Sequence, residues 1–146
     1  MQISDYQLIK KTGFLLLLLF FNSRCTPPAH QTIPYREVDF TIYPNSVQYA
    51  DLTHYGGHVY LTGGVCGIVV YRVNETDFVA YDRACPYDWQ DNATRLEVDE
   101  SGLLLVHPDC GSTFNILDGS VIRGPAVYPL KRYRCYYDGF ALRIYN

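Results

Sequence analysis

Turn-forming residues recur so often along this chain that they leave little room for long helices. From Gly56-Gly57 onward, short runs of β-branched and aromatic residues alternate with clusters of Gly, Asp, Asn and Ser. Asp-Gly between such runs, as at Asp118-Gly119 and Asp138-Gly139, is the strongest short signal for a β-hairpin. Strands separated by a turn at intervals of about 8–12 residues are typical of a β-sandwich or small barrel. The sequence therefore predicts an all-β domain.

The composition agrees with this prediction. Aromatic residues make up 15% of the chain, with 14 Tyr, and charged residues only 18%, which favours strands over helices. The turn signals separate the following expected strands: His58–Thr62, Cys66–Val73, Phe78–Asp82, Arg95–Val98, Leu103–His107, Phe114–Ile116, Val121–Ile122, Tyr128–Tyr137 and Phe140–Tyr145.

The first residues have the pattern of a secretory signal. Lys10 and Lys11 precede an apolar run, Phe14–Phe21, which is shorter than the ~20 residues needed to span a bilayer as a helix. A buried N-terminal helix is the alternative, but five consecutive Leu leave it no polar face. We expect a signal peptide over residues 1–24, a Pro-stiffened tether over 25–34 and one folded domain over 35–146.

Cys25 follows the apolar run at the place where the lipobox of bacterial lipoproteins has its cysteine. The resemblance implies that Cys25 carries a lipid, although Asn22 and Arg24 depart from the usual residues. We therefore expect an exported, membrane-anchored lipoprotein of the cell envelope that faces the periplasm, with plain secretion as the alternative. The net charge of −3 excludes nucleic acid as an expected partner.

Three loops between the expected strands resemble those of the Rieske [2Fe–2S] family. Cys85-Pro86-Tyr87 matches the first ligand loop, His107–Phe114 the second, and Gly124-Pro125-Ala126 the loop that leans over the cluster. The resemblance extends from about Tyr35 to the C-terminus. It implies a Rieske-like all-β fold of small antiparallel sheets, with a base subdomain and a loop-bearing, cluster-type subdomain.

The four ligand-equivalent positions depart from the family pattern. They are occupied by Cys85, Tyr87, His107 and Cys110, whereas the cluster needs two thiolates on one iron and two imidazoles on the other. The sequence leads us to expect no cofactor and no metal, with a [2Fe–2S] electron carrier that has unorthodox ligands as the alternative. If a metal binds, we expect Cys85, His107 and Cys110 to hold it, with Tyr87 or Asp88 as fourth ligand.

The resemblance also suggests disulfides. With Cys25 reserved for the lipid, four cysteines remain, and export implies an oxidising compartment. Because Cys85 and Cys110 lie on facing loops in this family, we expect them to form a disulfide in place of the cluster, worth up to ~3.5 kcal/mol. Cys66 and Cys135 would form the second disulfide or remain buried thiols.

No Ser-His-Asp spacing, phosphate loop or carboxylate pair indicates an enzyme. The expected function is that of a non-catalytic envelope module with a degenerate cluster site. Such a module would act through contacts with an unidentified envelope or membrane protein.

Overall fold

The computed structural model describes residues 33–90 and 94–146. The expected signal peptide, most of the tether and Cys25 lie outside the described residues. In the described part, no helix combines the length and the apolar composition needed to cross a membrane. The elements in chain order are β1 (Asp39–Ile42), the 3-10 helix η2 (Val47–Thr53), β2 (His58–Leu61), β3 (Ile68–Arg72), β4 (Phe78–Asp82), β5 (Glu97–Val98), β6 (Leu104–Val106), β7 (Thr113–Asn115), β8 (Val121–Arg123), β9 (Arg132–Tyr137) and β10 (Leu142–Tyr145).

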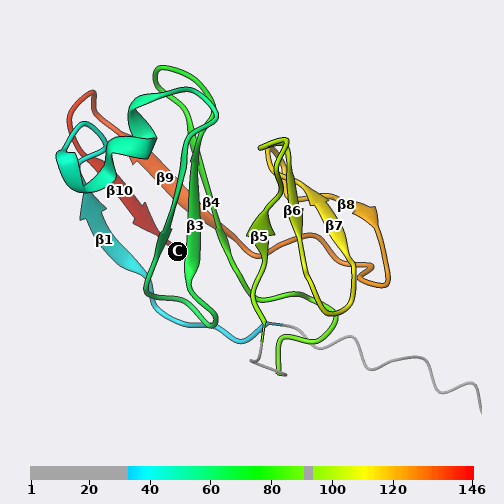
Figure 1. Ribbon diagram of the computed structural model, residues 1–146. Coiled ribbons are helices and arrows are strands. Elements are labelled where there is room, and N and C mark those ends of the chain that lie inside the picture. The colour runs from blue at the N-terminus through cyan, green and yellow to red at the C-terminus, as the bar shows by residue number, and fades with distance from the viewer. Residues whose placement is uncertain (1–32, 91–93) are drawn as a thin grey trace, which may run out of the picture.

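The strands of the described residues form two antiparallel sheets, which stand side by side in Figure 1. The larger sheet has the order β1-β10-β9-β4-β3-β2, and the smaller sheet is the meander β5-β6-β7-β8. The chain enters the smaller sheet after β4 and returns to the larger one at β9. This arrangement confirms the prediction of an all-β fold of small antiparallel sheets, with a base subdomain and a second, loop-bearing subdomain.

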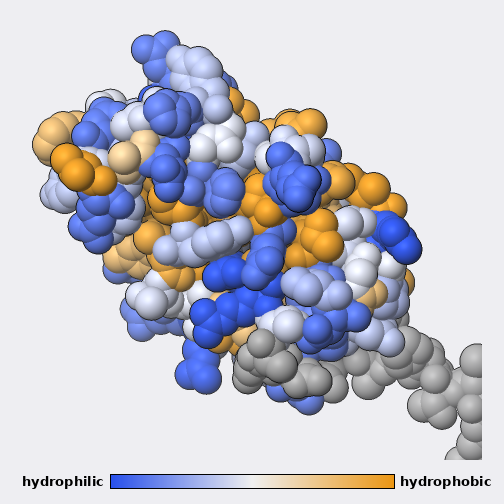
Figure 2. Space-filling model, in the orientation of Figure 1, coloured by the Kyte–Doolittle hydropathy of each residue, from blue (hydrophilic) through white to orange (hydrophobic). Residues whose placement is uncertain are grey.

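The core explains why β3 and β4 lie inside the larger sheet. Every residue of both strands is buried, including the apolar runs Ile68–Tyr71 and Phe78–Tyr81, as expected for strands that are covered on both faces. The side chains on one face of the β3–β4 pair pack with side chains of β1, β9 and β10. Those on the opposite face pack with side chains of the smaller sheet. Figure 2 shows apolar side chains on the visible face where the two sheets meet.

Two elements were absent from the sequence-based expectations. β1 pairs with β10 along Asp39–Ile42, and η2 follows it. A 3-10 helix this short has three residues per turn and does not produce the longer 3.6-residue pattern that reveals an α-helix. β1 is an edge strand, and its register depends on pairing with residues at the far end of the chain, which no local pattern indicates.

Tyr81 lies at the centre of the fold and has an unusual environment. Its side chain is fully buried in β4, and its hydroxyl has no hydrogen-bond partner among the described residues. Burial raises the pKa of Tyr81 to about 12 from the ordinary value of 10.0. Between these two pH values the folded protein keeps this proton, whereas the unfolded chain releases it.

The free energy of unfolding should therefore fall as the pH rises from about 10 to about 12. The share of Tyr81 in this fall is up to about 2.8 kcal/mol, because each unit of pKa shift corresponds to ~1.4 kcal/mol. Tyr81→Phe removes the unpaired hydroxyl, so we expect it to stabilise the protein by about 1 kcal/mol at pH 7 and to flatten the alkaline decline. Urea unfolding of both proteins at a series of pH values measures this, and equal declines would contradict it.

Candidate metal centre

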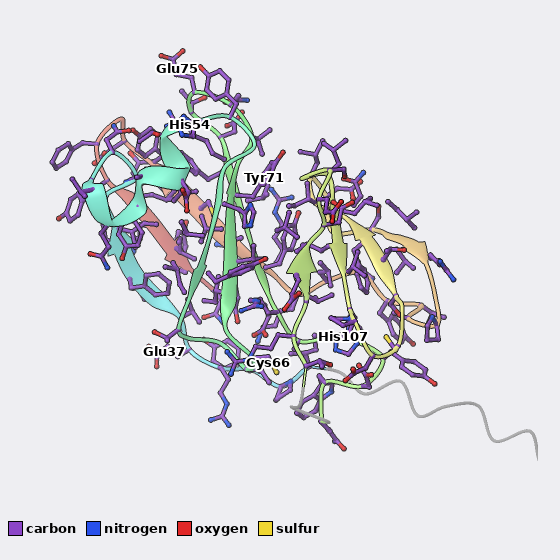
Figure 3. The ribbon with its side chains drawn as sticks, viewed as in Figure 1. Glu37, His54, Cys66, Tyr71, Glu75 and His107 are labelled. Atoms are coloured by element: carbon purple, nitrogen blue, oxygen red, sulfur yellow. The ribbon has the colours of Figure 1, made fainter. Side chains whose placement is uncertain are left out.

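Two loops at one end of the smaller sheet bring four potential ligands together. Cys85 and Asp88 belong to the loop that follows β4, and His107 and Cys110 belong to the turn between β6 and β7. One ligand atom from each of the four residues lies within 4.8 Å of all the others. Figure 3 shows His107 at the end of the smaller sheet, with the side chains of the two loops around it. Two thiols, an imidazole and a carboxylate therefore meet at one point.

The distances within this group are short. The Sγ atoms of Cys85 and Cys110 are 3.6 Å apart. Nδ1 of His107 lies 3.2 Å from Cys110 Sγ and 3.6 Å from Oδ1 of Asp88. That carboxylate oxygen is buried and has no hydrogen-bond partner among the described residues. A buried carboxylate oxygen without a donor is costly, and a cation among these four atoms would compensate its charge.

The group lies just below the surface. Cys85 and His107 are 1% and 2% exposed, respectively, while Cys110 and the Asp88 side chain are partly exposed. Burial raises the pKa of the Cys85 thiol to about 12, so this thiol keeps its proton at neutral pH unless a cation replaces it. A coordinating thiol is deprotonated outright by the metal, which makes the buried position compatible with metal binding.

Asp82, at the end of β4, holds the first loop in place. Its buried carboxylate accepts hydrogen bonds from the backbone N–H groups of Val65 at 2.7 Å, Cys66 at 3.1 Å and Ala84 at 3.0 Å. The hydroxyl of Tyr133 donates a fourth bond at 2.7 Å. Because Ala84 immediately precedes Cys85, this network determines where the first thiol enters the site.

The second loop is closed by its own backbone. The N–H of His107 donates to the carbonyl of Ser112, and the N–H of Gly111 donates to the carbonyl of His107, both at 2.9 Å. Gly111 has a φ of +70°, a conformation that other residues rarely adopt. Ser112 Oγ lies 3.1 Å from Cys110 Sγ and accepts a hydrogen bond from the N–H of Ala126 at 3.0 Å. The third loop is thus hydrogen-bonded to the second.

A hydrogen-bonded chain defines which nitrogen of His107 faces the site. The hydroxyl of Thr94 donates to the carboxylate of Asp109, and Oγ1 of Thr94 lies 3.0 Å from Nε2 of His107. A hydroxyl has one proton, so Thr94 must accept the hydrogen bond from Nε2–H. In a neutral ring this places the proton on Nε2 and leaves Nδ1, which accepts a hydrogen bond from the N–H of Cys110 at 3.4 Å, with the lone pair that faces Cys110 and Asp88.

The structure brings together three of the four ligand-equivalent residues that the sequence indicated. Cys85, His107 and Cys110 converge, while the fourth residue, Tyr87, is partly buried against the same hydrophobic core as the two cysteines. Asp88, which the sequence offered only as one of two possible fourth ligands, takes the remaining place. Thr94 was missed because no sequence spacing relates it to His107.

Neither expected disulfide is present in the structure. The sulfurs of Cys85 and Cys110 are in contact at 3.6 Å, well beyond the ~2.05 Å of a disulfide bond. Cys66 precedes β3 and Cys135 lies in β9, and β4 lies between these two strands. Two strand spacings amount to about 9.6 Å, which exceeds the ~6.8 Å that a disulfide tolerates between Cα atoms.

The expectation of no cofactor and no metal is wrong, because four ligands of complementary chemistry converge at this site. The residues do not match the family's own cluster, which has two thiolates on one iron and two imidazoles on the other. Here a carboxylate stands where a second imidazole would be needed. The donor set instead suits a borderline first-row metal such as iron or zinc.

Comparisons with known proteins gave matches among solved structures only. No protein-family model matches the sequence, and no curated protein matches it. The chain is similar to the ferredoxin of carbazole 1,9a-dioxygenase from Nocardioides aromaticivorans IC177, with a TM-score of 0.45, 17% identity, and coverage of 62% of this chain and 86% of that one. It is also similar to a chain in the complex of reduced oxygenase and oxidized ferredoxin in carbazole 1,9a-dioxygenase, with a TM-score of 0.45, 21% identity, and coverage of 62% and 82%.

Proposed function

We propose that this domain is an electron-transfer module with an iron centre at the site formed by Cys85, Asp88, His107 and Cys110. The observation that carries the proposal is the convergence of these four ligands from two loops. The proposal replaces the expected degenerate site with a metal-binding one and assigns no catalytic reaction to the domain. Iron would supply one-electron chemistry between Fe³⁺ and Fe²⁺ when bound.

The protein environment of the site fits this role. Cys85 and His107 are buried, which keeps water away from two of the ligands, while Cys110 reaches the surface and offers a short path to a redox partner. The Ser112 hydroxyl lies 3.1 Å from Cys110 Sγ, and hydrogen bonds to a ligand sulfur are one means by which proteins adjust the reduction potential of iron.

Metal analysis and spectroscopy of the full chain, purified without air or chelators, test the proposal. We expect bound iron, visible colour from sulfur-to-iron charge transfer, and an electron paramagnetic resonance signal that changes on one-electron reduction. Protein that remains colourless and free of iron after anaerobic reconstitution with iron, with and without sulfide, would rule out the electron-transfer function.

The hydrogen bond from His107 to Thr94 gives a prediction about metal affinity. Thr94→Val keeps the shape of the side chain but removes the acceptor that holds the proton on Nε2. We expect iron affinity to fall about 10- to 100-fold, the usual cost of losing such an outer hydrogen bond. Thr94→Ser keeps the hydroxyl and should retain most of the affinity. Competition with a coloured chelator measures all three proteins, and equal losses in both variants would point to packing as the cause.

Export and lipid anchoring form part of the same proposal. The support is the sequence alone, with its basic start, apolar run and Cys25. A lipid on Cys25 would keep the domain at the periplasmic face of an envelope membrane, where its partner is a protein that donates or accepts one electron. In a bacterial host supplied with labelled palmitate, the native chain should incorporate label, whereas Cys25→Ala should not and should leave the membrane fraction.

A further inference from the structure

We propose that the site holds a single metal ion in a Cys₂-His-Asp coordination sphere, not the two-iron, two-sulfide cluster that the fold family implies. The ligands are Sγ of Cys85 and Cys110, Nδ1 of His107 and a carboxylate oxygen of Asp88. The ion is a borderline first-row metal, iron or zinc. This inference rests on the proposed metal-binding function and specifies the number of metal ions and the identity of the fourth ligand.

The separations between the ligand atoms fit one tetrahedral ion. Metal–sulfur bonds of about 2.3 Å and metal–nitrogen or metal–oxygen bonds of about 2.0–2.2 Å place tetrahedral ligand atoms about 3.4–3.8 Å apart. The two sulfurs here are 3.6 Å apart. Nδ1 of His107 is 3.6 Å from Asp88 Oδ1 and 3.2 Å from Cys110 Sγ. The three distances lie within a few tenths of an ångström of this range.

The same separations leave too little space for a cluster. All four ligand atoms lie within 4.8 Å of one another, so a point among them is about 3 Å or less from each, close to one metal–ligand bond length. A two-iron cluster puts its two ligand pairs on different metal ions, with two sulfides between the irons. In this protein His107 Nδ1 and Cys110 Sγ, which come from the same loop, are almost in contact.

Asp88 completes the single-ion site and distinguishes it from the family's arrangement. Its Oδ1 atom is buried and lacks a hydrogen-bond donor among the described residues, although it lies in a loop with access to solvent. The turn in which the N–H of Asp88 donates to the carbonyl of Cys85 at 3.2 Å keeps both side chains in the group. Tyr87, between them, is partly buried against the hydrophobic core.

Cobalt is a suitable probe because Co²⁺ has a visible spectrum that reports its coordination. The full chain, reduced and freed of metal with a chelator, is titrated anaerobically with Co²⁺. We expect saturation at one Co²⁺ per chain, sulfur-to-cobalt charge-transfer bands and the intense visible bands of tetrahedral cobalt. Parallel samples receive Zn²⁺, iron alone, or iron with sulfide, followed by measurement of metal and acid-labile sulfide.

Two variants at neighbouring positions test the fourth ligand. Asp88→Ala removes the carboxylate, and we expect Co²⁺ affinity to fall at least about tenfold, since a direct ligand should matter no less than an outer contact. Its visible bands should shift as water replaces the carboxylate. Tyr87→Phe is the matched control and should leave both affinity and spectrum unchanged. If Asp88→Ala behaved like the native chain, or if Tyr87→Phe lost affinity, the proposed coordination would be wrong.

The outcomes separate this inference from the proposed function. One iron per chain without sulfide supports both. Two irons with two sulfides per chain overturn the single-ion site but preserve electron transfer. One tightly bound zinc with no retained iron supports the single-ion site and removes electron transfer. A chain that binds none of these metals overturns both.

Discussion

Cys110→Ser is expected to lower the affinity of the site for iron or cobalt by at least about 100-fold, because a direct thiolate ligand should matter more than an outer contact. The thiolate is the ligand that soft and borderline metals prefer, and Cys110 contacts two other members of the group, at 3.6 Å for Cys85 Sγ and 3.2 Å for His107 Nδ1. Serine has nearly the same size, but its hydroxyl remains protonated and binds such metals weakly. The charge-transfer bands should be reduced to those of one thiolate. Titration with Co²⁺ measures both effects.

Cys135→Ser provides the matched control. This cysteine lies in β9, paired with Ile144 of β10, and belongs to the core on the other side of the larger sheet. We expect its loss to leave metal binding unchanged, with at most a small effect on stability. Comparable losses of metal in both variants would mean that the effect of Cys110→Ser comes from general damage to the fold, and the assignment of Cys110 as a ligand would fail.

Asp82→Ala is expected to lower the free energy of unfolding by about 3–5 kcal/mol. The variant removes the shared acceptor of three backbone N–H groups and the Tyr133 hydroxyl. Leaving a buried donor unsatisfied costs about 1–3 kcal/mol, and the loss of a buried hydrogen-bond network belongs to the largest class of mutational effects. Urea unfolding of the metal-free protein measures the change.

Tyr133→Phe separates the contributions to this network. It removes one of the four donors and keeps the ring in the core, so we expect a smaller loss of about 1–2 kcal/mol. Because the N–H of Ala84 also loses its acceptor in Asp82→Ala, that variant should weaken metal binding as well, whereas Tyr133→Phe should not. If both variants lost the same free energy of unfolding, the contribution of Asp82 to stability would come mainly from its hydrogen bond with Tyr133, and not from its bonds with the backbone N–H groups.

Local sequence patterns were sufficient to predict the fold class and most of the strands. Phe78–Asp82 was predicted with the bounds that the structure gives, and the turns at Asp118-Gly119 and Asp138-Gly139 fall where strands end. Alternation, β-branching and turn chemistry act over a few residues and are therefore visible in the sequence. β1 was missed because its position depends on pairing with β10, at the other end of the chain.

For the site, the sequence identified the chemistry but not the geometry. Cys85, His107 and Cys110 were recognised as potential metal ligands, yet their departure from the family pattern led to the expectation of an empty, disulfide-closed site. That expectation treated each ligand-equivalent position separately. In the structure Asp88, one of the two possible fourth ligands, lies with these three residues, and the four side chains form a set that a single ion can use.

By itself, the sequence determined that this chain forms an all-β domain with sulfur and imidazole side chains on two of its loops. Only the tertiary structure decided which side chains meet, that Asp88 lies with the two cysteines and His107, and that Thr94 contacts Nε2 of His107. The physical reason is that a loop has no repeating pattern to set the direction of its side chains. Their directions follow from distant contacts, such as those of Asp82 with β9 and of Thr94 with the second loop.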